Sequence, residues 1–187
     1  MEEMNLDKIH QNLRGVSSDL DGKLNRSKKE TPMEIRQSEK IKIFIDEAIR
    51  YANAWMGTPY KWGGEAIGEG VDCSGLVRRI LTRSLPRFPS YDMTAQGIFD
   101  HLVERGCDIA KGYDKVRAGH VLFFGRDVYH ITHVAFAITP WHMIEAGGGN
   151  STTRTHNIAM KQGAWVRSNL IEKRADLCSH VDPWDKM

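Results

Sequence analysis

One of the three cysteines, Cys73, lies between Asp72 and Ser74 in the segment Val71-Asp-Cys-Ser-Gly-Leu76. The residues that follow keep their apolar side chains at helical spacing, which predicts that a buried helix begins at Cys73 and continues to Leu85. Unpaired N–H groups and the positive dipole end at a helix start favour an anion. A thiol there is a candidate nucleophile, although most free cysteines are small buried apolar residues.

A cysteine nucleophile needs a base within hydrogen-bond distance, and the base needs a group that orients it. His133 is the best candidate base, in the alternating segment Ile131–Ile138, which predicts a strand. Ala135 and Ala137 share its face and are small, so we expect room there for a helix N-terminus. The alternative, a structural histidine, is the more common role for a lone histidine in a strand.

A carboxylate, Glu145, lies in the next predicted strand, His142–Ala146. A carboxylate in an otherwise apolar strand is costly to bury unless it is paired. A neighbouring antiparallel strand would bring Glu145 beside His133, where it could accept a hydrogen bond from the imidazole. An exposed carboxylate on an edge strand explains the same pattern equally well.

Two aromatic residues precede the cysteine in Pro59-Tyr-Lys-Trp-Gly-Gly64. They could form one wall of a cleft. The Tyr60 hydroxyl and the Cys73 backbone N–H could together stabilise an oxyanion. For Trp62, packing in the core is the favoured interpretation.

The helical patterns come first in the chain and the strand patterns follow. Thr31, Pro32 and Glu34 predict a helix start, with the helix running to about Met56, and Thr94 predicts the start of a short helix that ends near Glu104. The predicted strands are Val121–Phe124, Ile131–Ile138 and His142–Ala146, with weaker signals at Thr155–Met160 and Ala164–Arg167. This order predicts an α+β fold with N-terminal helices packed on a central antiparallel sheet.

Residues 1–30 differ from the rest because they contain no aromatic residue and no cysteine. Their apolar residues recur every three or four positions, at Leu6, Ile9, Leu13, Val16, Leu20 and Leu24. This stripe predicts a helical arm that docks on a partner or a second copy, or else a marginal helix or frayed tail. The predicted organisation is an arm or tail over residues 1–30 and one domain over residues 31–187.

The overall composition argues against several classes of protein. The net charge is +2 over 187 residues and no basic stripe with aromatics is present, so a nucleic-acid partner is not indicated. Three cysteines without a pairing pattern do not indicate a disulfide framework. No apolar run could span a bilayer, so we expect no membrane insertion. The N-terminus has no signal-peptide pattern, so we expect synthesis in the cytoplasm, with delivery in a virion or by secretion if the protein acts elsewhere.

The histidines and cysteines do not form a recognisable metal-binding motif, since neither C-x-x-C nor H-E-x-x-H occurs. His130 and His133 would point to opposite faces of a strand and so make a poor shared metal site. We therefore expect no metal or other cofactor. The histidines expected at the surface are His10, His101, His156 and His180.

Five segments, taken in order, resemble the NlpC-type cysteine peptidases, which are papain-like enzymes that cleave peptide bonds in bacterial cell-wall stems. The matching segments are Pro59–Gly64, Val71–Leu76, Thr94–Gly97, Val116–Phe124 and His133–Phe136. The resemblance implies a papain-like NlpC-type fold in which Cys73 is the nucleophile and His133 the general base. Glu145 takes the third polar position, which is often a histidine in this family. The residues implied to bind substrate or to line the cleft are Tyr60, Asp72 and Ser74, with Trp62 as a further candidate.

The resemblance implies a cysteine peptidase that hydrolyses an amide bond in peptidoglycan stem peptides through a Cys-His-Glu triad and an acyl-enzyme. One alternative is an amidase or acyltransferase on the same fold. Another is a structural subunit of a phage tail or secretion device with a vestigial site, for which the stripe in residues 1–30 would be the partner surface. The stretch Met143–Asn150 is similar to phage-tail and prophage members.

Overall fold

The computed structural model describes residues 31–187, so the predicted arm and partner surface in residues 1–30 lie outside the described residues. Helix α2 (Pro32–Asn53) begins as predicted, because Glu34 accepts a hydrogen bond from the Thr31 N–H at 2.6 Å and Thr31 Oγ1 accepts one from the Glu34 N–H at 3.3 Å. The helix ends at Asn53 and not at Met56, because the next backbone N–H groups bond to carbonyls three residues back, in tighter turns.

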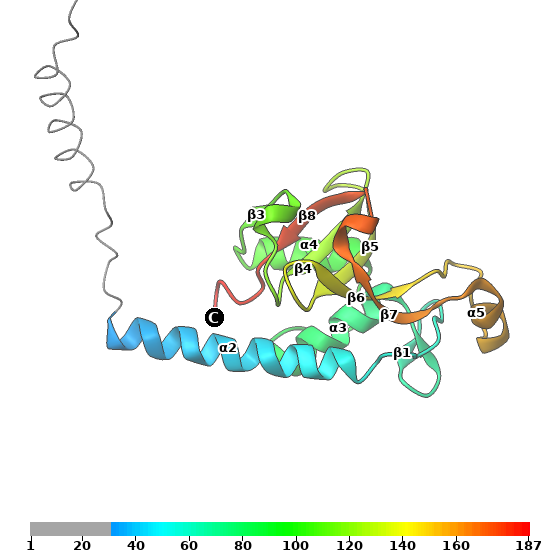
Figure 1. Cartoon of the computed structure of the whole chain (residues 1–187), viewed down its shortest axis with the longest axis horizontal. Helices are drawn as coiled ribbons and strands as arrows, with labels where there is room; N and C mark the ends of the chain where they lie inside the picture. Colours follow the sequence, from blue (N-terminus) through cyan, green and yellow to red (C-terminus); the bar gives the residue numbers. More distant parts are fainter. Residues whose placement is uncertain (1–30) are drawn as a thin grey trace, which may run out of the picture. The chain divides into compact units, whose positions relative to one another are not determined.

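The part of the chain from Gln37 to Met187 is built around a six-stranded antiparallel sheet with the strand order β3-β8-β4-β5-β6-β7 (Figure 1). Its strands are β3 (Ile109–Ala110), β4 (Val121–Gly125), β5 (Ile131–Ala137), β6 (His142–Gly147), β7 (Trp165–Leu170) and β8 (Leu177–Val181). A small separate hairpin pairs β1 (Glu65–Ala66) with β2 (Gly70–Val71). The 3-10 turns are η1 (Tyr113–Lys115) and η2 (Ile171–Lys173).

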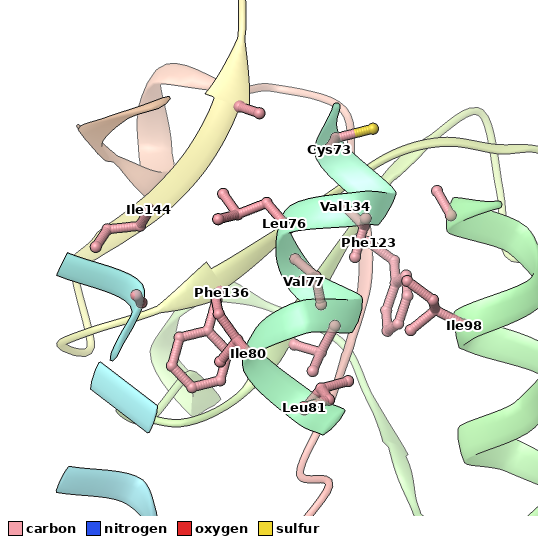
Figure 2. Close-up of a cluster of buried hydrophobic side chains, with 14 of the residues drawn as sticks. Cys73, Leu76, Val77, Ile80, Leu81, Ile98, Phe123, Val134, Phe136 and Ile144 are labelled. Carbon is pink, nitrogen blue, oxygen red and sulfur yellow. The ribbon is translucent and has the colours of Figure 1, made fainter. Parts of the chain in front are cut away.

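Helices α3 (Cys73–Ser84) and α4 (Ala95–Glu104) pack on one face of this sheet, against β5. Alternation along β5 directs Val134 and Phe136 into the main core beneath α3, as Figure 2 shows. The opposite face of the sheet carries a second, smaller apolar cluster of Val116, Leu122, Phe124, Ala135, Ala137, Met143 and Ile171. The predicted α+β class, with helices packed on a central antiparallel sheet, is confirmed.

Two further local predictions are wrong. The weak strand signal at Thr155–Met160 is the helix α5 (His156–Gln162), which begins because Thr155 Oγ1 accepts a hydrogen bond from the Ile158 N–H at 3.3 Å. His180, expected at the surface, is buried in β8 and stacks on His120 with ring centroids 5.0 Å apart. Within residues 31–187, no helix is both long and apolar enough to cross a membrane.

Candidate active site

Cys73 is the first residue of α3, and Asp72 is the residue that holds it there. Asp72 Oδ1 accepts hydrogen bonds from the Gly75 N–H at 2.8 Å and from the Ser74 hydroxyl at 2.9 Å. Its Oδ2 accepts a hydrogen bond from the Gly63 N–H at 2.8 Å. The carboxylate therefore caps the helix and fastens the glycine-rich loop to it. Figure 2 shows the thiol at this end of α3, above the apolar side chains that the helix sends into the core.

The glycine-rich loop passes so close to α3 that Gly75 has no room for a side chain. A Cβ atom on Gly75 would lie 2.4 Å from the carbonyl oxygen of Gly64. We expect Gly75→Ala to lower the free energy of unfolding by about 1–3 kcal/mol, because either the loop or the helix must move. Helix propensity alone predicts the opposite sign, since alanine is favoured over glycine within helices.

Urea unfolding of the two proteins measures this effect, and Gly68→Ala is the matched control. A Cβ atom on Gly68 would meet nothing within 4 Å. We expect the control to unfold at nearly the wild-type urea concentration. A Gly75→Ala protein as stable as the wild type would contradict the close approach of the loop.

His133 on β5 and Glu145 on β6 form a buried pair. His133 Nε2 lies 2.8 Å from Glu145 Oε2, and the exposed fractions of the two residues are 9% and 2%. Because Nε2 is engaged by the carboxylate, Nδ1 is the ring nitrogen left to face a thiol. The predicted pairing of these strands brings the two side chains together, as expected from the sequence.

The pKa values of the pair are shifted in opposite directions. Burial acts to lower the pKa of His133, but hydrogen bonds to Cys73 and Glu145 outweigh it and raise the pKa to about 9. Burial acts to raise the pKa of Glu145, but the hydrogen bond and charge of His133, with Asn169 and Arg174, hold it at about 2. At neutral pH the pair is therefore an imidazolium and a carboxylate.

The route by which α3 approaches His133 differs from the prediction. The helix packs on the Val134 and Phe136 face of β5, and not on the face of the small residues Ala135 and Ala137. Those alanines belong to the second apolar cluster of the sheet, on the opposite face. The thiol still lies close enough to His133 to raise the pKa of its imidazole, because Cys73 is the very first residue of α3.

Glu145 has three further partners that the sequence did not indicate. Asn169 Nδ2 donates a hydrogen bond to Glu145 Oε1 at 2.8 Å. Arg167 Nε lies 3.5 Å from the same oxygen, and Arg174 Nη1 lies 3.6 Å from Oε2, the oxygen that His133 contacts. These residues follow β6 in β7 and after η2, in segments where no motif is present.

A cleft of about 420 Å³ opens beside Cys73. It brings together every residue that the sequence assigned to substrate contact, since Tyr60, Trp62, Asp72 and Ser74 all line it. Trp62 is 48% exposed, so the favoured interpretation of core packing is wrong. Burial, with negative charge at Cys73 and Asp72, raises the pKa of the Tyr60 hydroxyl, which therefore stays a hydrogen-bond donor at neutral pH.

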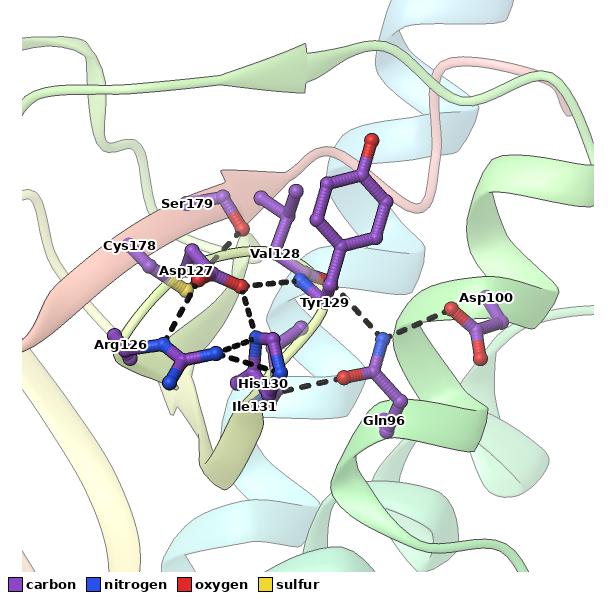
Figure 3. A network of polar contacts seen from close by, with 10 residues as sticks. All are labelled: Gln96, Asp100, Arg126, Asp127, Val128, Tyr129, His130, Ile131, Cys178 and Ser179. Carbon is purple, nitrogen blue, oxygen red and sulfur yellow. Dashed lines mark hydrogen bonds and ion pairs between the residues drawn. The ribbon is translucent and has the colours of Figure 1, made fainter.

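The far wall of the cleft is fastened by Gln96 in the first turn of α4. Gln96 Oε1 accepts a hydrogen bond from the Ile131 N–H at 3.0 Å, and its Nε2 donates to the Val128 carbonyl at 3.0 Å (Figure 3). Ile131 and Thr132 line the cleft immediately before His133. Gln96 thus holds the start of β5, which includes the cleft residues Ile131 and Thr132, against α4.

Comparison with known proteins gives one family. A model of the NlpC/P60 family matches residues 57–169, which is more than half of the chain. The probable endopeptidase YafL of Escherichia coli strain K12 is 30% identical over 127 residues, which cover 65% of this chain and 47% of YafL. The chain thus spans less than half the length of this curated relative.

Solved structures share the fold. The peptidoglycan hydrolase RipB of Mycobacterium tuberculosis is 20% identical, with a TM-score of 0.53 over 77% of this chain and 66% of that one. RipD of the same organism is a non-catalytic NlpC/p60 domain protein adapted to peptidoglycan binding. It is 16% identical, with a TM-score of 0.51 over 74% of this chain and 95% of RipD. The predicted papain-like architecture is therefore confirmed at the level of the fold.

Proposed function

The chain belongs to the NlpC/P60 family, and we propose that it is a cysteine peptidase that hydrolyses an amide bond in the stem peptides of bacterial peptidoglycan. The names of its relatives support the substrate class, since YafL is a probable endopeptidase and RipB a peptidoglycan hydrolase. One observation carries the proposal for the reaction: Cys73 starts a helix at an open cleft and lies close enough to His133 to raise the pKa of its imidazole, and His133 is itself paired with a buried carboxylate. The substrate would place the action of the protein at the bacterial cell wall.

In the proposed reaction the proton of the Cys73 thiol resides on His133, as the imidazolium of the pair, and the thiolate attacks the carbonyl carbon of the scissile amide. The imidazolium then gives its proton to the leaving amine as the C–N bond breaks, which leaves a thioester on Cys73. Water, deprotonated by the neutral imidazole, attacks the thioester and releases the carboxylate and the thiol. Glu145 holds the ring so that Nδ1 faces sulfur throughout.

The oxyanion of each tetrahedral intermediate needs donors close to the nucleophile. The backbone N–H of Cys73 lies in the first turn of α3, where it has no partner within the helix. Tyr60 lines the same cleft, and its protonated hydroxyl supplies a second donor. Asp72 is excluded from this role because both of its oxygens accept hydrogen bonds from the loop and the helix.

The non-catalytic relative RipD makes peptidoglycan binding without catalysis the second candidate function. The pair of His133 and Glu145 favours catalysis in this chain. A buried imidazolium and carboxylate cost free energy to desolvate, and a domain that only bound peptides would have no use for a histidine held against a thiol at the cleft.

The proposal is tested by incubating the protein with purified sacculi and identifying the soluble products by mass spectrometry. We expect fragments cut within the stem peptide, with a new amino terminus and intact glycan chains. Protein whose Cys73 has been alkylated by iodoacetamide, as verified by peptide mapping, should release nothing above background. Release that survives complete alkylation, or products cleaved between sugars, would overturn the assignment.

The same preparation distinguishes an amidase or acyltransferase from a peptidase. Acid quenching during turnover should trap an adduct on Cys73 whose added mass equals that of a stem-peptide fragment. An adduct with the mass of a fatty acyl chain after incubation with lipid esters, and none with sacculi, would favour the acyltransferase alternative.

A further inference from the structure

The carboxylate of Glu145 is almost completely buried, yet it faces more positive than negative charge. His133 and Arg174 approach one oxygen, at 2.8 Å and 3.6 Å, and Arg167 approaches the other at 3.5 Å. A carboxylate as third member of a triad would by itself bind the imidazolium proton strongly, because charges interact strongly at buried sites. The extra arginines therefore need an explanation in terms of the pair that they surround.

Arg174 is held more firmly than its partial exposure would suggest. Its Nε and Nη2 donate to the two oxygens of Asp176 at 3.1 Å and 2.8 Å, in a bidentate contact. Its guanidinium carbon lies 4.7 Å from the centroid of the Phe124 ring. The remaining Nη1 points to Glu145. The Tyr113 hydroxyl also donates to the backbone carbonyl of Arg174 at 2.7 Å, which fixes the main chain.

Phe124 links Arg174 to the histidine. It lies opposite His133 in the pairing of β4 with β5, and the centroids of the two rings are 5.7 Å apart. The guanidinium of Arg174 packs over the same ring. A phenyl ring excludes water and does not hydrogen-bond to either group. The positive charge of Arg174 therefore acts on the imidazolium at short range, but cannot replace Glu145 as its partner.

We propose that Arg174 is a positioning residue of the candidate active site. Anchored by Asp176 and Phe124, it orients the Glu145 carboxylate and limits how tightly that carboxylate holds the proton on His133. This proposal rests on the proposed cysteine peptidase function, in which His133 must both receive a proton from Cys73 and release it to the leaving amine. A histidine that held its proton too firmly would be a poor acid in the second step.

The charges around the imidazole agree with this role. The groups that act on His133 are Cys73 from α3, Glu145 from β6, and Arg174 and Asp176 from the segment between η2 and β8. Cys73 and Glu145 act to raise the pKa of His133, whereas Arg174 acts to lower it. Arg174 is thus a positive group that opposes the effects of Cys73 and Glu145 on the ring.

Arg167 provides a matched control for Arg174. Both arginines contact Glu145 at similar distances, but Arg167 lies beside Oε1, the oxygen away from His133. Its side chain is also more exposed, at 41% against 29% for Arg174, so water screens its charge more. If only the net charge mattered, replacing either arginine would shift the titration of His133 equally. An effect specific to Arg174 would appear only when Arg174 is replaced.

The test is the titration of the His133 ring nitrogens by NMR in 15N-histidine-labelled protein, with the signal assigned by its loss in His133→Gln. We expect Arg174→Gln to raise the midpoint by about 1 pH unit, and Arg174→Lys to stay close to the wild type. Arg167→Gln should shift the midpoint by less than half as much. An unchanged or lower midpoint in Arg174→Gln, or an equal rise in Arg167→Gln, would overturn the proposal.

Arg174→Met is a second neutral variant that keeps an apolar contact with Phe124, for use if Arg174→Gln does not fold. The basic limb of kcat/KM for stem-peptide hydrolysis should move to higher pH in step with the NMR midpoint. If Arg174 had only a structural role, its replacement would lower kcat at every pH and leave the basic limb of the kcat/KM profile at the same pH. That result would overturn the proposal. Because the NMR titration needs no substrate, it decides the role of Arg174 even if peptidoglycan is not hydrolysed.

Discussion

Replacing Cys73 by alanine is expected to lower the rate of peptide release from peptidoglycan by about 10⁶-fold, the scale on which hydrolases lose activity when the nucleophile is removed. The physical reason is that no other group in the cleft can form the covalent intermediate. The hydroxyls that line the cleft are those of Tyr60, Ser74, Thr94 and Thr132, and none of them hydrogen-bonds to the paired histidine. The measurement is the initial rate of soluble peptide release, normalised to folded protein by circular dichroism.

Cys178→Ala is the control for this substitution. Cys178 is a partly buried thiol in β8 whose sulfur donates to the Phe123 carbonyl at 3.2 Å, and it does not line the cleft. We expect this variant to keep wild-type activity. A Cys73→Ala protein with measurable turnover would show that the thiol is not the nucleophile.

Replacing Glu145 by alanine is expected to have the second largest effect, on both stability and activity. The substitution leaves the imidazole of His133 and the amide of Asn169 without their acceptor and removes the counter-charge of Arg174. Breaking a buried ion pair by removing one partner costs about 3–5 kcal/mol of folding free energy. Because His133 loses the partner that orients it, kcat/KM of the variant should also fall by about 10²–10⁴-fold. Urea unfolding and hydrolysis rates measure the two effects.

Glu145→Gln separates charge from shape. The amide keeps an oxygen that can accept from His133 Nε2 and fills the same volume, but it carries no charge. We expect activity in the order wild type, Glu145→Gln, Glu145→Ala, with the glutamine variant closer to wild type in stability. If the glutamine variant were as inactive as the alanine variant, orientation of the ring could not be the main function of this position.

The cysteine, the histidine and the glutamate could all be found in the sequence because each leaves a local signal. Cys73 has a cap and a helical pattern after it, and His133 and Glu145 are polar residues in apolar strands. The face on which the helix packs could not be found in this way. The small residues Ala135 and Ala137 indicated that α3 approaches their face, but they belong to the second apolar cluster on the other side of the sheet.

Other features depend on chain segments that meet only in the folded protein. Arg174 is 29 positions from Glu145 and follows a short 3-10 turn, so no periodicity or motif indicates their ion pair. His180 was expected at the surface because no strand pattern was recognised around it, yet it lies in β8, between β3 and β4 in the sheet. α5 has only seven residues, too few for a helical period to outweigh a weak strand pattern.

The loop that carries Tyr60 obtains its backbone partners from the far end of the chain. The Gly57 N–H donates to the Val166 carbonyl and the Tyr60 N–H to the Ala164 carbonyl, both at 2.9 Å. A nascent chain that has not yet reached Ala164 therefore lacks the hydrogen bonds that set one wall of the cleft. The entropic cost of closing the long loop between these two segments must be met before their contacts form, so this closure is slow. During synthesis on the ribosome, the cleft is thus completed only after Val166 has emerged.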